Sequence, residues 1–91
     1  MIRLDKFLKL SRLVKRRTVA QEMSEIGAVR INQRSSKPSS NVSDGDIIEI
    51  AYQRRVLVVR VLTSDETKLK HNEPAYEQLE ERRVNQEERP W

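Results

Sequence analysis

The hydrophobic residues of this chain change their spacing at Gly27, and that change constrains the fold more than any other sequence feature. Before it, Leu4, Phe7 and Leu8 recur at intervals of three and four residues, the period of one helical face. After it, apolar and polar residues alternate, as in the VRI of residues 29–31. With 91 residues in all, this order predicts one α+β domain in which two N-terminal helices pack on a small antiparallel sheet.

The two helices have recognisable ends. The first begins near Leu4 and carries Asp5 in its first turn, where a negative charge suits the helix dipole. The second begins at Arg17 or Thr18 and ends before Gly27, which stands where a left-handed glycine terminates a helix. The apolar face predicted for the second helix consists of Val19, Ala20, Met23 and Ile26.

Three short strands are predicted after Gly27. They cover residues 29–31, 47–52 and 56–62. Pro38 and the pair Asp44-Gly45 mark turns in the long connection between the first two, and Arg54 lies in a basic turn between the last two. Short strands joined by tight turns are typical of an antiparallel sheet.

The charge balance divides the chain at residue 62. Residues 1–62 hold 13 Lys and Arg against 6 Asp and Glu, whereas residues 63–91 hold 5 against 8. We expect residues 1–62 to form the folded domain and residues 63–91 to form an acidic linker and tail. Ala75 to Glu88 could form a helix, but its narrow apolar face predicts a helical or partly disordered tail.

The composition argues against an enzyme. There is no cysteine, so disulfides and thiolate metal sites are excluded and a reducing compartment is expected. His71 is the only histidine, and the two glycines are isolated, so no phosphate-binding glycine loop is present. We predict no catalytic residue, no metal and no cofactor. Neither a signal peptide nor a membrane span is found, which predicts a cytoplasmic protein without a membrane partner.

Seven cations gather near the N-terminus: Arg3, Lys6, Lys9, Arg12, Lys15, Arg16 and Arg17. Such a run is commonly a solvated helix face. However, Lys15 to Arg17 stand at the start of the second helix, where positive charge opposes the helix dipole and costs a few tenths of a kcal/mol per residue. The same cations, with the free N–H groups of a helix start, suit phosphate. An arrangement that weakens the fold but suits an anion indicates a binding site.

A second polar region lies between residues 30 and 40. It contains Arg30, Arg34 and Lys37 together with Asn32 and several serines. One interpretation is an ordinary hairpin loop, and the other is a second set of contacts to phosphate and ribose. The residues alone favour neither.

Several linked motifs within residues 2–62 resemble the S-four-type RNA-binding domain. They are RLDKFL, the KRRT that enters the second helix, the glycine that ends it, VRIN, KPSS and DGDIIEI. The resemblance implies an αL-like RNA-binding fold, with Arg3 and Arg17 as the first choices for RNA contact. Together with the two polar regions it gives the predicted RNA-binding residues Arg3, Lys6, Arg12, Lys15, Arg16, Arg17, Arg30, Arg34 and Lys37. The family often has Asn-Gly where this chain has Asn32-Gln33, which leaves that turn's geometry open.

The chain looks most like small stand-alone bacterial members of this family, which are related to the fifteen-kilodalton heat-shock protein. That resemblance implies binding to rRNA of the large ribosomal subunit and to a stranded peptidyl-tRNA. It also implies assistance to an alanine-tailing quality-control factor. We expect the protein to be a monomer. Two alternatives remain open: a regulator that binds a structured RNA outside the ribosome, and an assembly protein that meets an acidic protein through its basic face.

Overall fold

The computed structural model describes residues 1–85 and 89–91. Its helices are α1 (Leu4–Leu10), α2 (Arg17–Glu25) and α3 (Glu66–Lys70). Its strands are β1 (Ile2–Arg3), β2 (Val29–Ile31), β3 (Arg34–Ser35), β4 (Asn41–Val42), β5 (Ile47–Ala51), β6 (Arg55–Val61) and β7 (Tyr76–Arg83).

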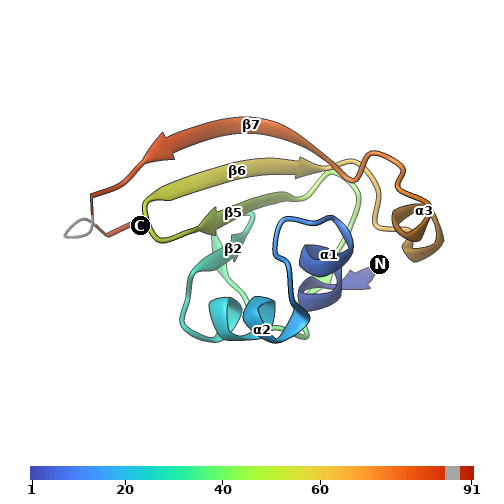
Figure 1. Ribbon diagram of the computed structural model, residues 1–91, viewed down its shortest axis with the longest axis horizontal. Coiled ribbons are helices and arrows are strands. Elements are labelled where there is room, and N and C mark those ends of the chain that lie inside the picture. Colours follow the sequence, from blue (N-terminus) through green and yellow to red (C-terminus); the bar gives the residue numbers. More distant parts are fainter. Residues whose placement is uncertain (86–88) are drawn as a thin grey trace.

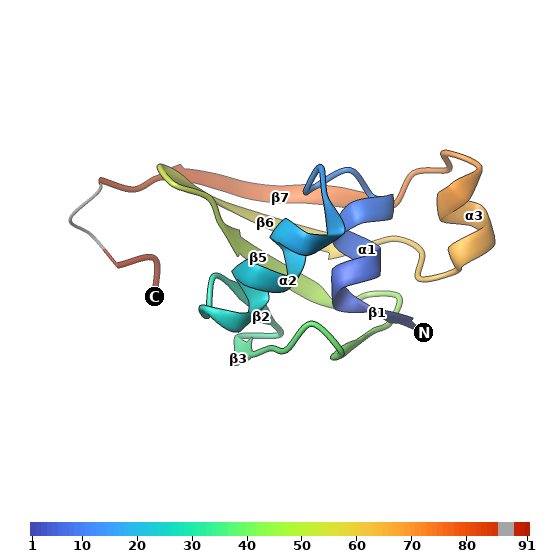
Figure 2. The same ribbon diagram turned by 60° about the horizontal axis from the view of Figure 1, so that its bottom comes forward.

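The main sheet has five antiparallel strands in the order β3-β2-β5-β6-β7, and β1 pairs separately with β4. Helices α1 and α2 lie together on one face of this sheet, while α3 sits beyond one end of it (Figure 1). The view in Figure 2 shows β1 below α1 beside the N-terminus, and β3 below β2 and α2. The predicted α+β architecture of helices on an antiparallel sheet is confirmed.

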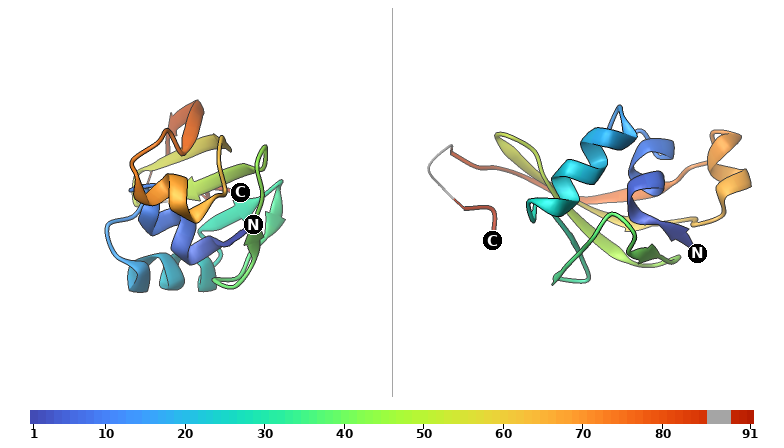
Figure 3. Two further views of the ribbon diagram at one scale, coloured as in Figure 1. Left: turned by 90° about the vertical axis from the view of Figure 1, so that its right-hand side faces the viewer. Right: turned by 90° about the horizontal axis from the view of Figure 1, so that it is seen from below.

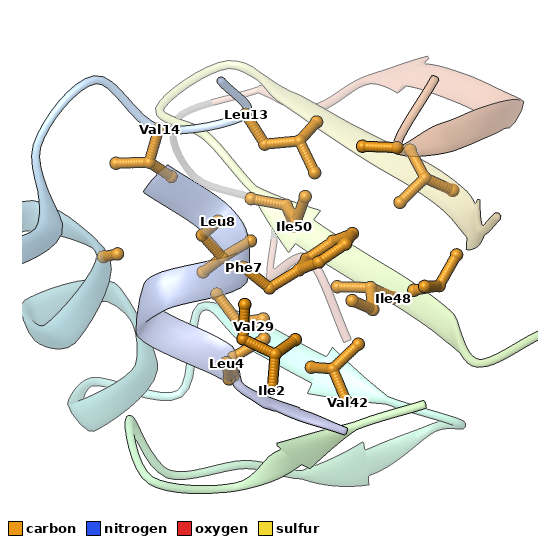
Figure 4. Close-up of a cluster of buried hydrophobic side chains, with 14 of the residues drawn as sticks. Ile2, Leu4, Phe7, Leu8, Leu13, Val14, Val29, Val42, Ile48 and Ile50 are labelled. Atoms are coloured by element: carbon orange, nitrogen blue, oxygen red, sulfur yellow. The ribbon is translucent and has the colours of Figure 1, made fainter. Parts of the chain in front are cut away.

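The core lies between α1 and the strands. Leu4, Phe7 and Leu8 of α1 are fully buried, and Figure 4 shows Phe7 pointing toward Ile48 and Ile50 of β5. Complete burial of each such side chain contributes about 1.5–3 kcal/mol. The three- and four-residue spacing of apolar side chains in α1 therefore identifies the residues that pack this helix against the sheet.

The apolar face predicted for α2 is partly wrong. Ala20 and Ser24 are the buried residues of this helix, whereas Val19 is exposed and Ile26, just past its end, is 79% exposed. Small side chains let α2 approach closely, and the Ser24 hydroxyl is satisfied by donating to the Ala20 carbonyl at 2.9 Å. The predicted terminator is confirmed: Gly27 has φ +81°, a left-handed conformation that favours glycine.

The prediction of a C-terminal helix is also wrong. Tyr76 to Arg83 form β7, which pairs along the whole length of β6. Without β7, the N–H and C=O groups on one edge of β6 would lack partners in the sheet, and pairing satisfies them. The end of the predicted helix, residues 86–88, lies outside the described residues.

The predicted linker also contains structure. Asp65 caps α3 by accepting a hydrogen bond from the backbone N–H of Thr67 at 2.9 Å, and Leu69 is buried in the core. The segment after residue 62 thus contributes both to the core and to the sheet. The extent of the RNA-binding unit, residues 1–62, stays a prediction.

The turn that departs from the family pattern keeps a tight hairpin. Ile31 pairs with Arg34, so Asn32 and Gln33 form a two-residue loop, and both have positive φ angles, +52° and +64°. Such angles are those of a type I′ turn, in which Asn-Gly is the preferred pair. Gln33 therefore occupies a left-handed position without the freedom of glycine.

Candidate nucleic-acid interface

The N-terminal cations are organised by a buried carboxylate. The Asp5 side chain has no exposed surface, and its Oδ2 accepts hydrogen bonds from Arg17 Nε at 3.1 Å and Gln21 Nε2 at 2.9 Å. Its Oδ1 accepts from the backbone N–H of Lys6 at 2.8 Å and lies 3.5 Å from Arg3 Nε. Arg3 and Arg17, 14 positions apart in sequence, are thereby held by one carboxylate. We call Asp5, with Arg3, Arg17 and Gln21 around it, the Asp5 centre.

Asp5 remains charged in this setting. Burial raises its pKa, but the hydrogen bonds from Gln21 and Arg17, with the charge of Arg17, outweigh burial and leave the pKa below its usual value. The two arginine side chains stay about half exposed, at 53% for Arg3 and 44% for Arg17. Each guanidinium thus has one edge held by Asp5 and the rest open to a ligand.

The start of α2 lacks the groups that normally complete a helix N-terminus. Its N-cap residue, Arg16, makes no side-chain capping bond, and no acidic residue lies in its first turn. Lys15, Arg16 and Arg17 are all exposed there. In this part of the described chain, free N–H groups and cations face solvent together, as the sequence predicts for a phosphate site.

A surface hollow joins the two polar regions that the sequence shows separately. It is lined by Arg3, Gln21, Ser24, Glu25, Ser36, Lys37, Pro38 and Ser39. Leu4 and Asp5 donate backbone hydrogen bonds to the carbonyls of Ser40 and Pro38, at 2.8 and 3.2 Å, which fixes this loop against the start of α1. Arg3 and Lys37 therefore line one hollow. Its polar lining contains many donors and a single acid, Glu25.

Two of the predicted contacts are engaged elsewhere. Lys6 forms an ion pair with Glu66 of α3, and this pairing helps to hold the pKa of Glu66 below its usual value. Arg12, which has φ +67°, donates to the side-chain oxygen of Asn72 at 2.8 Å. The Lys6 side chain thus links α1 to α3, and Arg12 contacts a residue that lies just past the end of α3.

Arg30 lies on the opposite face of the sheet from the helices. Val29, its neighbour in β2, is buried in the core, and alternation along the strand turns Arg30 outward. Its guanidinium lies 3.7 Å from Glu49 and 5.1 Å from the centre of the Trp91 ring. Arg34 is exposed at the end of the β2–β3 hairpin. RNA contact by these two residues stays a prediction.

Sequence reasoning missed the organising role of Asp5 and the contribution of Gln21. From the sequence, Asp5 is predicted only to interact with the helix dipole, and Gln21 is predicted to face solvent. Nothing in the local pattern shows that α2 packs against the start of α1. Among the described residues, no group of three or more His, Asp or Glu is placed to hold a metal ion. None of the described helices is long and apolar enough to span a membrane.

Comparison with known proteins places these features in a family. The model of the S4 domain matches residues 2–48. The RQC P-site tRNA stabilizing factor of Streptococcus pneumoniae is 40% identical over 86 residues, covering 93% of this chain and 98% of the relative. The factor of the same name from Bacillus subtilis is 38% identical over 86 residues, covering 93% and 100%.

A solved structure agrees with the fold. The trimeric structure of Vibrio cholerae heat shock protein 15 matches with a TM-score of 0.75 at 25% identity, over 86% of this chain and 81% of that one. The S4 match includes Arg3, Asp5, Arg17, Gln21 and Lys37, and therefore covers the whole Asp5 centre and all of the residues that line the hollow beside it.

Proposed function

Since the chain belongs to the S4-domain family of RQC P-site tRNA stabilizing factors, we propose that it binds RNA on the large ribosomal subunit next to a peptidyl-tRNA. The observation that carries the proposal is the Asp5 centre. A buried carboxylate holds Arg3 and Arg17 half exposed, with Lys15 and Arg16 beside them at an uncapped helix start. Arginine guanidinium groups and the free N–H groups of a helix start donate hydrogen bonds to the phosphate oxygens of RNA.

The chemistry of the surface favours backbone recognition over base stacking. Phe7 is fully buried, and Tyr52 and Tyr76 are partly buried against the core. The cationic region thus offers few aromatic faces for splayed bases, and contacts to phosphate and to the shape of a folded RNA dominate. If about five phosphates are neutralised, log K falls against log salt with a slope of about −3 to −5.

We place the protein in ribosome-associated quality control as a non-enzymatic holding factor. Binding rRNA and tRNA together keeps the peptidyl-tRNA in position while a partner adds alanine residues to the stalled chain. In this role the protein acts as a monomer in the cytoplasm. Support for the ribosomal setting comes from the names of the relatives, which refer to P-site tRNA stabilization.

The first test measures RNA affinity over a range of salt concentrations. We expect Arg3→Ala and Arg17→Ala each to weaken binding to a structured RNA and to make the salt slope about one unit shallower. Lys68→Ala is the matched control, because it removes one exposed charge from α3, outside the interface. Equal behaviour of all three variants would count against the Asp5 centre as the binding site.

The second test separates the ribosomal role from the alternative of an RNA regulator. Alanine addition is measured on purified large subunits that carry a stranded peptidyl-tRNA, with the tailing factor present and this protein added or omitted. The proposal predicts that adding wild-type protein lengthens the alanine tails. Adding the Arg17→Ala protein should lengthen them little or not at all. Tight binding to free RNA without any effect on tailing would favour a regulator acting outside the ribosome.

A further inference from the structure

A second group of cations lies at the end of the sheet remote from α3. Arg54 occupies the turn between β5 and β6, Arg55 begins β6, and Arg83 ends β7. These residues line one surface hollow together with Glu81, Val84 and Asn85. In Figure 1 and in the right-hand view of Figure 3, the β5–β6 turn and the end of β7 extend past the helices. This site is therefore distinct from the hollow that contains Arg3 and Lys37.

The strand register brings the arginines together at a cost to the sheet. Arg55 and Arg83 are directly opposite each other in the β6–β7 pair, where like charges are destabilising. The backbone N–H of Val84 donates to the Arg54 carbonyl at 3.0 Å, which keeps the end of β7 beside the turn. Glu81 pairs with Arg55 at 3.2 Å. Within the described residues, neither Arg54 nor Arg83 has an acidic partner.

Arg55 is fixed in place by an aromatic ring. Its guanidinium lies 4.7 Å from the centre of the Tyr52 ring, and the Tyr52 hydroxyl donates to the Leu13 carbonyl at 2.6 Å. Because Tyr52 is partly buried and carries Arg55 over its ring, that ring face is not open to a nucleobase. The ligand that fits three clustered guanidinium groups without a free stacking surface is a run of backbone phosphates.

We propose that Arg54, Arg55 and Arg83 form a second RNA-backbone site, which holds an RNA segment different from the one at the Asp5 centre. The inference rests on the proposed function, since it gives the same protein a second contact with RNA. Two separated cationic sites at different places on one small domain allow it to bridge two RNA segments. The β5–β6 turn and β7 lie beyond residues 2–48, the part matched by the S4 model.

The test compares the salt dependence of tRNA binding between two double variants of the full chain. Arg54→Gln with Arg83→Gln removes two charges from the proposed site. Arg60→Gln with Lys68→Gln removes two exposed charges elsewhere and is the matched control. We expect a slope about two units shallower and weaker binding for the site variant, with a melting temperature equal to or above that of wild type. The control should retain the wild-type slope to within about half a unit.

A triple variant that adds Arg17→Ala to Arg54→Gln and Arg83→Gln shows whether the two sites are separate. For independent sites, the fold-losses in affinity of Arg17→Ala and of the double variant multiply in the triple variant. A triple variant no weaker than Arg17→Ala alone would overturn the second site. A double variant that binds tRNA as tightly as its control would also overturn the second site. If the double variant keeps its tRNA affinity but loses binding to poly-glutamate, the cluster binds an acidic protein and not RNA.

The outcomes also separate this inference from the proposed function. If wild-type protein binds RNA and Arg17→Ala weakens that binding while the double variant does not, only the second site fails. If wild-type protein binds neither tRNA nor large subunits, the proposed function fails and the second site fails with it.

Discussion

Replacing Asp5 by asparagine tests whether position or total charge governs RNA binding. The substitution makes the cationic region one unit more positive, so charge alone predicts tighter binding. The structure leads to the opposite expectation. Asp5 holds Arg17 at 3.1 Å and lies 3.5 Å from Arg3, and without a carboxylate both guanidinium groups lose the contact that orients them.

The cost to stability follows from the hydrogen bonds. Asp5 accepts from Arg17, Gln21 and the Lys6 backbone at 2.8–3.1 Å. Asparagine keeps one oxygen, but its amide group faces other donors, so one or two bonds worth about 1.5–3 kcal/mol each are lost. Water recovers part of this, because Arg17 is half exposed. A net loss of about 2 kcal/mol lowers the melting temperature by roughly 10 °C.

The assay measures RNA affinity and thermal unfolding of the same Asp5→Asn protein, with binding recorded well below its melting temperature. We expect affinity to fall about as far as in Arg17→Ala, since both changes affect the same guanidinium. Arg17→Lys serves as a control that keeps the charge but cannot reproduce the arginine fork. Unchanged or tighter RNA binding by a folded Asp5→Asn protein would refute the reasoning.

Three further predictions concern stability. The lowered pKa of Asp5 stabilises the fold fully above about pH 5, and this stabilisation is lost as the pH falls below 3.8 toward the folded-state pKa; acid unfolding followed by circular dichroism should be less steep in Asp5→Asn. Gln33→Gly should raise the free energy of unfolding by about 0.5–1 kcal/mol, because Gln33 has φ +64°, and an unchanged denaturation midpoint would contradict this. Truncation after Leu62 should lower the melting temperature by more than about 10 °C, since it removes β7 and the buried Leu69; calorimetry showing an equally stable fragment would contradict a structural role for this segment.

The parts of the fold that sequence predicts well are those fixed by local spacing. The intervals between Leu4, Phe7 and Leu8 identify the buried face of α1, and Gly27 ends α2 because its left-handed conformation is a local requirement. The same reasoning overestimates the core of α2. Ile26 lies in register with Val19 and Met23, but it follows the last helical residue and its side chain points away from the core.

The C-terminal segment illustrates a limit of local reasoning. Glu77, Glu80 and Glu81 are good helix formers, and no local pattern distinguishes them from a solvated helix. Their conformation is decided by β6, whose free edge pairs with this segment. The Asp5 centre likewise depends on contacts between segments that are distant in the sequence. Asp5 and Arg17 are twelve positions apart, and only the crossing of α2 over the start of α1 brings them together.

Co-sedimentation with purified large ribosomal subunits tests the central claim most directly. The wild-type protein, Arg3→Ala, Arg17→Ala and the Lys68→Ala control are each mixed with subunits that are empty or carry a peptidyl-tRNA. We predict that wild type and control sediment with the subunits, more strongly when peptidyl-tRNA is present, and that both arginine variants stay largely in the supernatant. Failure of wild type to sediment, or equal sedimentation of the arginine variants and the control, would contradict the claim that the Asp5 centre binds RNA on the large subunit.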